Sequence, residues 1–234
     1  MSQLAHKFIQ YLSATALCVT CMAASASVVI TGTRVIYPAD AKEVTVKVNN
    51  KGAKPVLIQS WIDNGDTKAK PENISVPFIL TPPINRVEPD KGQTLRLSYT
   101  GASLPTNKES VFWLNVLEIP AKTAQQDNTS HLQMAFRSRI KLFFRPSGLS
   151  GNANEAPKLL TWSATAGGVQ ATNPTPFYVS LVFVTVNGNV VEGQMVAPGE
   201  NRKLTLPGVK VGNKVSYGFV NDYGAVNNVE SIIH

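Results

Sequence analysis

The sequence predicts an all-β protein made of two immunoglobulin-like β-sandwich domains with a cleft between them. Short runs rich in Val, Ile, Leu and aromatic residues alternate with Asn, Gly, Pro and Asp, which is the pattern of strands and turns. No amphipathic helical stretch interrupts them, and strands at this density are typical of antiparallel sandwiches. Without its leader, the 234-residue chain is long enough for two domains of about 100 residues each.

Residues 1–26 have the layout of a secretory signal peptide. Lys7 precedes an apolar and small-residue run from Leu12 to Ala24, and Ala24, Ser25 and Ala26 form a small-x-small cleavage site. The run is too short and too rich in Ser and Thr for a membrane span, and no later segment is long enough, so we expect export without stable membrane insertion. Cys18 and Cys21 lie inside the signal, so the mature chain has no cysteine and its cores alone must hold it.

Residues 27–146 are predicted to form the first domain. Six of its segments suit strands, namely Val28–Tyr37, Glu43–Val48, Val56–Ile62, Thr94–Tyr99, Ser110–Ile119 and Leu132–Phe144. Trp61, inside the third segment, is expected to pack in the core.

A change in composition after Pro146 predicts a linker over residues 147–157, which are small, polar and prone to turns. A second β-rich domain is predicted over residues 158–234. Its expected strands are Phe177–Val186, Lys214–Val220 and Val226–Ile233, and the Asn187–Gly188 pair indicates a hairpin turn because both residues tolerate positive φ.

The composition gives little support for catalysis, metal binding or nucleic-acid binding. The formal charge of +7 is scattered rather than gathered in a dense Lys/Arg run, which favours a solvated surface over a nucleic-acid site. Only His131 and His234 follow the signal, too few for a His/Cys metal cluster. The known nucleophile, zinc-protease and phosphate-loop motifs do not occur, and composition alone does not exclude a pair of catalytic carboxylates. We expect no enzyme activity and no cofactor.

One strand can be interpreted in two ways. In Leu132–Pro146, large apolar residues alternate with Gln, Ala and Arg, so one face of the strand is apolar. That face could cover the domain's own core, or it could be offered to the sheet of a partner.

The chain then resembles a known family. Leu104–Pro120, L-P-T-N-K-E-S-V-F-W-L-N-V-L-E-I-P, is similar to the signature of the periplasmic pilus-assembly chaperones. The resemblance extends to T-P-P-I-N-R-V-E-P from Thr81, I-K-L-F-F-R-P from Ile140 and N-D-Y-G-A from Asn221. It thus covers almost the whole mature chain. The short connection between Pro120 and Leu132 resembles the short-loop branch of the family, which is associated with rod-like pili.

The resemblance implies a non-catalytic mechanism in which the chaperone lends a strand to a pilus subunit that lacks its last one. The lent side chains would be Leu132, Met134, Phe136 and Ile140. The alternative, that they face the chaperone's own core, stays open for Ile140 above all, because Ser138 interrupts the row of large residues.

The resemblance also implies two groups of charged residues. Arg34 and Lys141 match the basic pair that grips the terminal carboxylate of the subunit and so fixes the register of the lent strand. Glu109, Arg145 and Asp222 match a buried ion network between the domains, which is expected to fix their angle more than to add stability.

The partners implied are pilus or fimbrial subunits and an outer-membrane usher, and the implied location is the periplasm. The free chaperone could also cap its own strand in a homodimer. The competing hypothesis is an exported, non-enzymatic β-sandwich binding module, either an adhesin or a carbohydrate-binding domain. Against it, the mature chain lacks the cysteine pair and alternating N-terminal extension typical of a pilus subunit, and shows no cluster of aromatic residues in loops.

Overall fold

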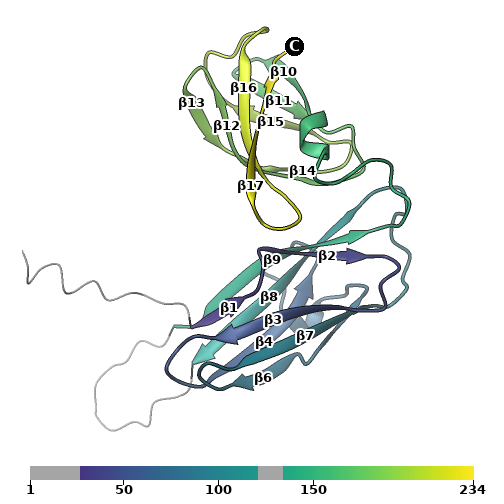
Figure 1. Cartoon of the computed structure of the whole chain (residues 1–234), viewed down its shortest axis with the longest axis vertical. Helices are drawn as coiled ribbons and strands as arrows, with labels where there is room; N and C mark the ends of the chain where they lie inside the picture. The colour runs from purple at the N-terminus through teal and green to yellow at the C-terminus, as the bar shows by residue number, and fades with distance from the viewer. Residues whose placement is uncertain (1–26, 121–133) are drawn as a thin grey trace, which may run out of the picture.

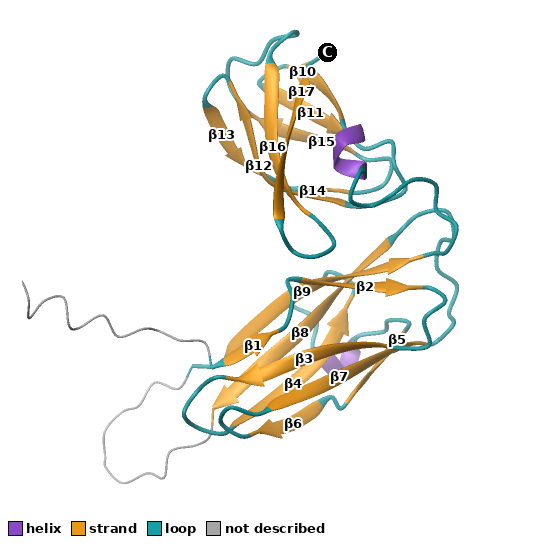
Figure 2. Cartoon of the chain, viewed as in Figure 1, coloured by secondary structure: helices purple, strands orange, loops and turns teal. Residues whose placement is uncertain are grey.

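The computed structural model describes residues 27–120 and 134–234. They form two β-sandwiches, one from each half of the chain, joined at a bend (Figure 1). Strands account for nearly all the regular structure, with two single-turn 3₁₀ helices at Pro71–Asn73 and Ala156–Leu159 (Figure 2). The predicted fold class is confirmed. None of the helices in the described residues has the length and apolar character needed to cross a membrane.

The first domain contains strands β1 to β9 in two facing sheets. They are β1 (Val28–Ile30), β2 (Arg34–Pro38), β3 (Val44–Asn50), β4 (Val56–Asp63), β5 (Phe78–Thr81), β6 (Ile84–Val87), β7 (Gly92–Tyr99), β8 (Ser110–Pro120) and β9 (Phe136–Arg145). One sheet has the order β1-β3-β7-β5 and the other has the order β2-β9-β8-β4-β6. Every pairing is antiparallel except that of β2 with β9, which is parallel.

The second domain has the same layered plan. Its strands are β10 (Thr161–Thr165), β11 (Gly168–Thr172), β12 (Val179–Val186), β13 (Asn189–Glu192), β14 (Met195–Val196), β15 (Asn201–Thr205), β16 (Lys214–Val220) and β17 (Val226–Ile232). One sheet has the order β10-β11-β15, and the other has the order β13-β12-β16-β17 with β14 beside β12. The predicted hairpin turn is present, since Asn187 and Gly188 both have positive φ and Val186 pairs with Asn189.

Each domain has its own apolar core. In β4, every second residue from Val56 to Ile62 is buried, while Leu57, Gln59 and Trp61 between them are less buried, as the period of two along a strand requires. Trp61 lies on the outward face and is half-buried, so its prediction as a core residue is wrong. The fully buried tryptophan is Trp162, which packs in the second core beside Tyr217.

Two strand predictions differ from the structure, and several strands in both domains were not predicted. The segment predicted as one strand over Val28–Tyr37 is split between two sheets, because the chain bends at Gly32, whose φ of 96° suits glycine. Strands β5 and β6 were not predicted, since nearby prolines mask them in the sequence. The strand predicted from Leu132 begins at Phe136; Leu132 itself lies outside the described residues.

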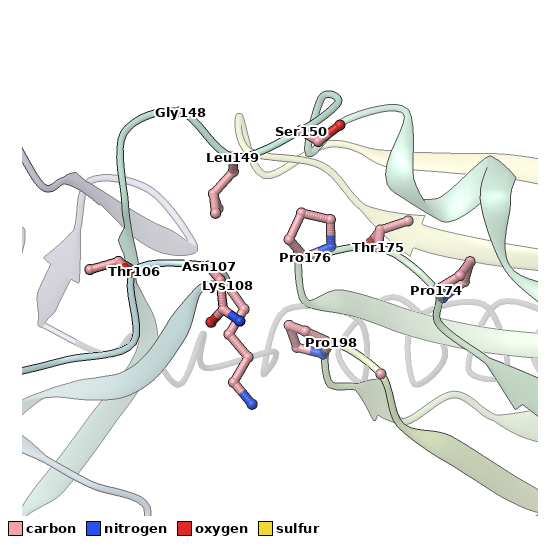
Figure 3. Close-up of a pocket in the computed structure, with 11 residues that line it drawn as sticks. Thr106, Asn107, Lys108, Gly148, Leu149, Ser150, Pro174, Thr175, Pro176 and Pro198 are labelled. Carbon is pink, nitrogen blue, oxygen red and sulfur yellow. The ribbon is translucent and has the colours of Figure 1, made fainter.

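The segment predicted as a linker is partly built into the second domain. Ala156 and Pro157, its last residues, are buried, and Leu149 packs against the second core. At the same junction, a hollow of about 650 Å³ lies between Asn107 on the first domain and Pro176 on the second (Figure 3). The two sandwiches are thus joined by the packed residues of the predicted linker as well as by the interdomain contacts described below.

Candidate functional site

Arg34 and Lys141 lie side by side although 107 positions of sequence separate them. They are register partners in the parallel pairing of β2 with β9, so their side chains leave the same face of the sheet. The Arg34 guanidinium donates a hydrogen bond through Nη1 to the carbonyl of Val220 in the second domain at 2.8 Å. The Lys141 ammonium reaches the hydroxyl of Ser180, also in the second domain, at 3.5 Å. The pair therefore stands where the two domains face each other.

The basic pair has unused capacity to bind an anion. Arg34 Nε is buried and has no hydrogen-bond partner within the described part of the chain. Neither Arg34 nor Lys141 forms an ion pair with a carboxylate in residues 27–120 or 134–234. A buried donor without a partner is unfavourable, so a carboxylate entering here gains hydrogen bonds and charge neutralisation together.

The pKa shifts of Arg34 and Lys141 also favour an anion at this position. Burial lowers the pKa of Lys141, and the positive charge of Arg34 lowers it further. Burial also lowers the pKa of Arg34, although Asp222 and Glu109 oppose the effect from a distance. Two positive charges thus lie close together in a partly desolvated position. Their repulsion and the loss of solvation favour the binding of an anionic ligand.

Glu109, Arg145 and Asp222 come together in an ion network that bridges the domains. Arg145 Nε donates to Glu109 at 2.6 Å, and its two terminal nitrogens donate to the Asp222 carboxylate at 2.7 and 2.9 Å. Glu109 is 2% exposed and accepts a further bond from the amide of Tyr178 at 2.8 Å. Asp222 is anchored in turn, because its amide donates to Asn154 at 3.0 Å.

The charges of this network support one another. Burial raises the pKa of Glu109, while the charge of Arg145 and the Tyr178 amide oppose that shift and favour the carboxylate. Burial works to lower the pKa of Arg145, but its bonds to Asp222 and Glu109 outweigh burial and raise it. One arginine thus holds an acid from each domain.

Two of the predicted donor residues, Phe136 and Ile140, lie in the part of β9 that has a free edge within the described residues. Strand β9 pairs with β8 along Phe136–Phe144, whereas β2 covers its other edge only from Lys141 onward. In the described residues, the stretch Phe136–Ile140 therefore has a strand on one side only. Met134 and Phe136 are 57% and 53% exposed, while Ile140 is half-buried and packs against the core of the first domain.

Sequence reasoning missed the cluster that holds this stretch in place. Arg139 donates to the Asp63 carboxylate at 2.5 and 3.2 Å, and its guanidinium lies 4.6 Å from the ring centre of Trp113. Asn115 also donates to Asp63, at 2.7 Å. Burial opposes ionisation of Asp63, but these bonds outweigh it and lower its pKa. Only the sheet register brings β4, β8 and β9 together at this point, so spacing along the chain gave no signal.

Phe143 is a second residue that was missed. It is 2% exposed, lies on the same face of β9 as Lys141, and packs outside the core of the first domain. Its ring stands 5.8 Å from that of Tyr178 in the second domain, with the Arg34 guanidinium 5.7 Å from its centre. Phe143 thus places an apolar ring beside Arg34, on the face of β9 that carries Lys141.

Comparison with known proteins decides the family. Residues 27–150 match the model described as pili and flagellar-assembly chaperone, PapD N-terminal domain, and residues 155–231 match that of the pili assembly chaperone PapD, C-terminal domain. The chain belongs to the pilus-assembly chaperone family. The resemblance drawn from Leu104–Pro120 is confirmed.

Relatives and solved structures of this family cover nearly the whole chain. The chaperone protein FimB/FhaD of Bordetella pertussis is 47% identical over 220 residues, which is 90% of both chains. The probable fimbrial chaperone YadV of Escherichia coli is 46% identical over 229 residues, covering 90% of this chain and 93% of that protein. The crystal structure of the Pseudomonas aeruginosa CupB2 chaperone has a TM-score of 0.77 at 41% identity, covering 88% of this chain and all of the other.

A solved complex is also similar. The Salmonella enterica SafA pilin in complex with the SafB chaperone matches with a TM-score of 0.78 at 29% identity, covering 88% of this chain and 96% of that chain. These similar proteins are chaperones, a class not known for enzymes, and the competing hypothesis of an adhesin or carbohydrate-binding module is not retained.

Proposed function

We propose that this protein is a periplasmic chaperone that lends the free-edged part of β9 to fimbrial subunits. The observation that carries the proposal is the edge of Phe136–Ile140, which pairs with no other strand in the described part of the chain, together with the exposed side chains of Met134 and Phe136. An unpaired strand edge beside exposed apolar side chains invites pairing with another chain. A subunit that lacks its last strand has the complementary need, because its backbone groups and apolar groove are uncovered.

The lent row consists of Leu132, Met134 and Phe136 in this proposal, and it ends at Phe136. Ile140 was expected to be lent as well. Its contact with the first core supports a role in holding β9 to its own domain. The row therefore stops where the chaperone's own core begins.

Arg34 and Lys141 set the register of the lent strand. The free Arg34 Nε and the weakly bonded Lys141 ammonium suit the terminal carboxylate of a subunit. Charge-assisted hydrogen bonds of this kind contribute about 1.5–3 kcal/mol each when shielded from water. A slip of one residue would turn every lent side chain to the wrong face, so a fixed end point has a large effect on binding.

The bridge from Arg145 to Glu109 and Asp222 holds the two domains at the angle that binding needs. The second domain supplies Val220 and Ser180, the two groups that orient the basic pair. Delivery of the bound subunit to an outer-membrane usher completes the proposed role. Without a subunit, a second copy of the chaperone is a natural partner for the free edge.

Co-expression with a fimbrial subunit in the periplasm tests the proposal. We expect a soluble one-to-one complex that co-purifies with the wild-type chain. The Arg34→Ala, Lys141→Ala double variant should remain folded and lose the complex. The matched control removes two exposed lysines of the same domain, Lys54→Ala and Lys91→Ala, and should bind normally. Binding by the first double variant at the wild-type level would contradict the proposed anchoring role.

A further inference from the structure

Glu118 is a buried carboxylate with an unusual set of partners. It lies near the end of β8, is 8% exposed, and pairs in register with Phe136. Its oxygens accept a hydrogen bond from the Val28 amide at 3.1 Å and another from the Ser27 hydroxyl. Buried carboxylates are normally paired with a cation. Across residues 27–120 and 134–234, none of the ion pairs involves Glu118.

Removal of the signal peptide would create the missing cation. Cleavage after Ala26, as the sequence predicts, makes Ser27 the first residue of the mature chain. The Ser27 nitrogen is three bonds from its own hydroxyl oxygen, which already contacts Glu118. In the precursor this nitrogen is an uncharged amide. After cleavage it becomes an ammonium group, since a free α-amino group ordinarily titrates near pH 7.7–8.0.

We propose that Glu118 is the receiving site for the α-ammonium group of Ser27, and that their ion pair fastens β1 only in the processed chain. Strand β1 needs such a fastening because it is three residues long and, in the described part of the chain, pairs with β3 alone. Its remaining anchor at this end is the bond from the Lys51 amide to the Ser27 carbonyl, at 2.6 Å. The Lys51 side chain is exposed and forms no ion pair with Glu118.

The position of the ion pair between Ser27 and Glu118 matters for the shape of the first domain. Through Glu118, the start of β1 is tied to the end of β8, directly opposite the first residue of β9. The chain crosses from one sheet to the other just after β1, so a loose β1 would leave that side of the sandwich open. Proteolytic processing would then complete the fold. This inference stands independently of subunit binding.

A double-mutant cycle on the exported protein tests the ion pair. One change is Glu118→Gln, which keeps the shape and the acceptor oxygen but removes the charge. The other inserts two glycines between Ala26 and Ser27, which moves the ammonium away. Each change alone should lower the thermal midpoint by several degrees, and the combination should lower it no further, because both remove the same interaction. Glu192→Gln, at an exposed position in the second domain, is the matched control and should have no effect.

A second measurement covers the case in which the glycine insertion prevents folding. In the intact protein with a selectively labelled Ser27, NMR should give an α-amino pKa above the ordinary range, falling into that range in Glu118→Gln. Mass spectrometry should place the mature N-terminus at Ser27. Additive losses in the cycle, equal α-amino pKa values in the two proteins, or a different N-terminus would overturn the proposal.

Discussion

The two halves of β9 differ in the way that a fixed and a lent strand should differ. From Lys141 to Phe144 the strand lies between β2 and β8, and Leu142, Phe143 and Phe144 are buried. Within the described residues, the stretch from Phe136 to Ile140 has a neighbouring strand on one side only, and Phe136 is more than half exposed. One continuous strand is thus anchored at its end and open at its start, with Lys141 at the boundary. Rigidity in one half can hold the other half extended for a partner.

The largest expected effect comes from breaking the anchored half at Arg145. In Arg145→Ala, the buried Glu109 loses its cation, and removing one member of a buried pair typically costs about 3–5 kcal/mol. We expect a lower yield of folded protein and a looser interdomain angle, measured by chemical unfolding and solution scattering. Adding Glu109→Gln should restore part of the stability, because it removes the unpaired charge. Unchanged scattering and unchanged expression in Arg145→Ala would contradict the bridging role.

Two alanine substitutions, one in each half of β9, compare the two halves directly. Leu142→Ala removes a fully buried side chain and should lower the free energy of unfolding by about 2–5 kcal/mol. Phe136→Ala removes an exposed side chain and should change that free energy by less than about 0.5 kcal/mol. The order reverses for subunit binding, where Phe136→Ala should weaken the complex at least about tenfold, since burying a Phe contributes roughly 1.5–3 kcal/mol. A large stability loss in Phe136→Ala would mean that its side chain serves the chaperone's own core.

The smallest expected effect concerns the boundary residue, Lys141. Burial, together with Arg34, lowers its pKa in the folded protein, so its charge destabilises the free fold at neutral pH. Lys141→Met should therefore raise the free energy of unfolding slightly while weakening subunit binding. The gain should fade as the pH rises through the lowered pKa of Lys141 toward about 10.5, and it should be absent above that pH, where the lysine is neutral in both states. Lys47→Met, at an exposed position on β3, is the control and should show neither effect.

Much of this arrangement could be predicted from the sequence, for identifiable reasons. The composition and turn pattern predicted the two sandwiches, and the family resemblance pointed to Arg34 and Lys141 as a pair although they are far apart in the chain. The contacts that the sequence did not reveal depend on the register between neighbouring strands. Arg139 meets Asp63 only because β4, β8 and β9 align at that level. The exposure of Trp61 follows from which face of β4 is inward, and a single strand pattern does not decide that in advance.

Amide hydrogen exchange along β9, with and without a fimbrial subunit, tests the central claim most directly. In the free protein, the amides of Phe136–Ile140 that point away from β8 should exchange quickly, while those of Leu142–Phe144 should exchange slowly. Subunit binding should slow exchange at Phe136–Ile140 and leave Leu142–Phe144 unchanged. Exchange at Phe136–Ile140 that is slow in the free protein, or that does not change when the subunit binds, would contradict the claim that this half of β9 is lent.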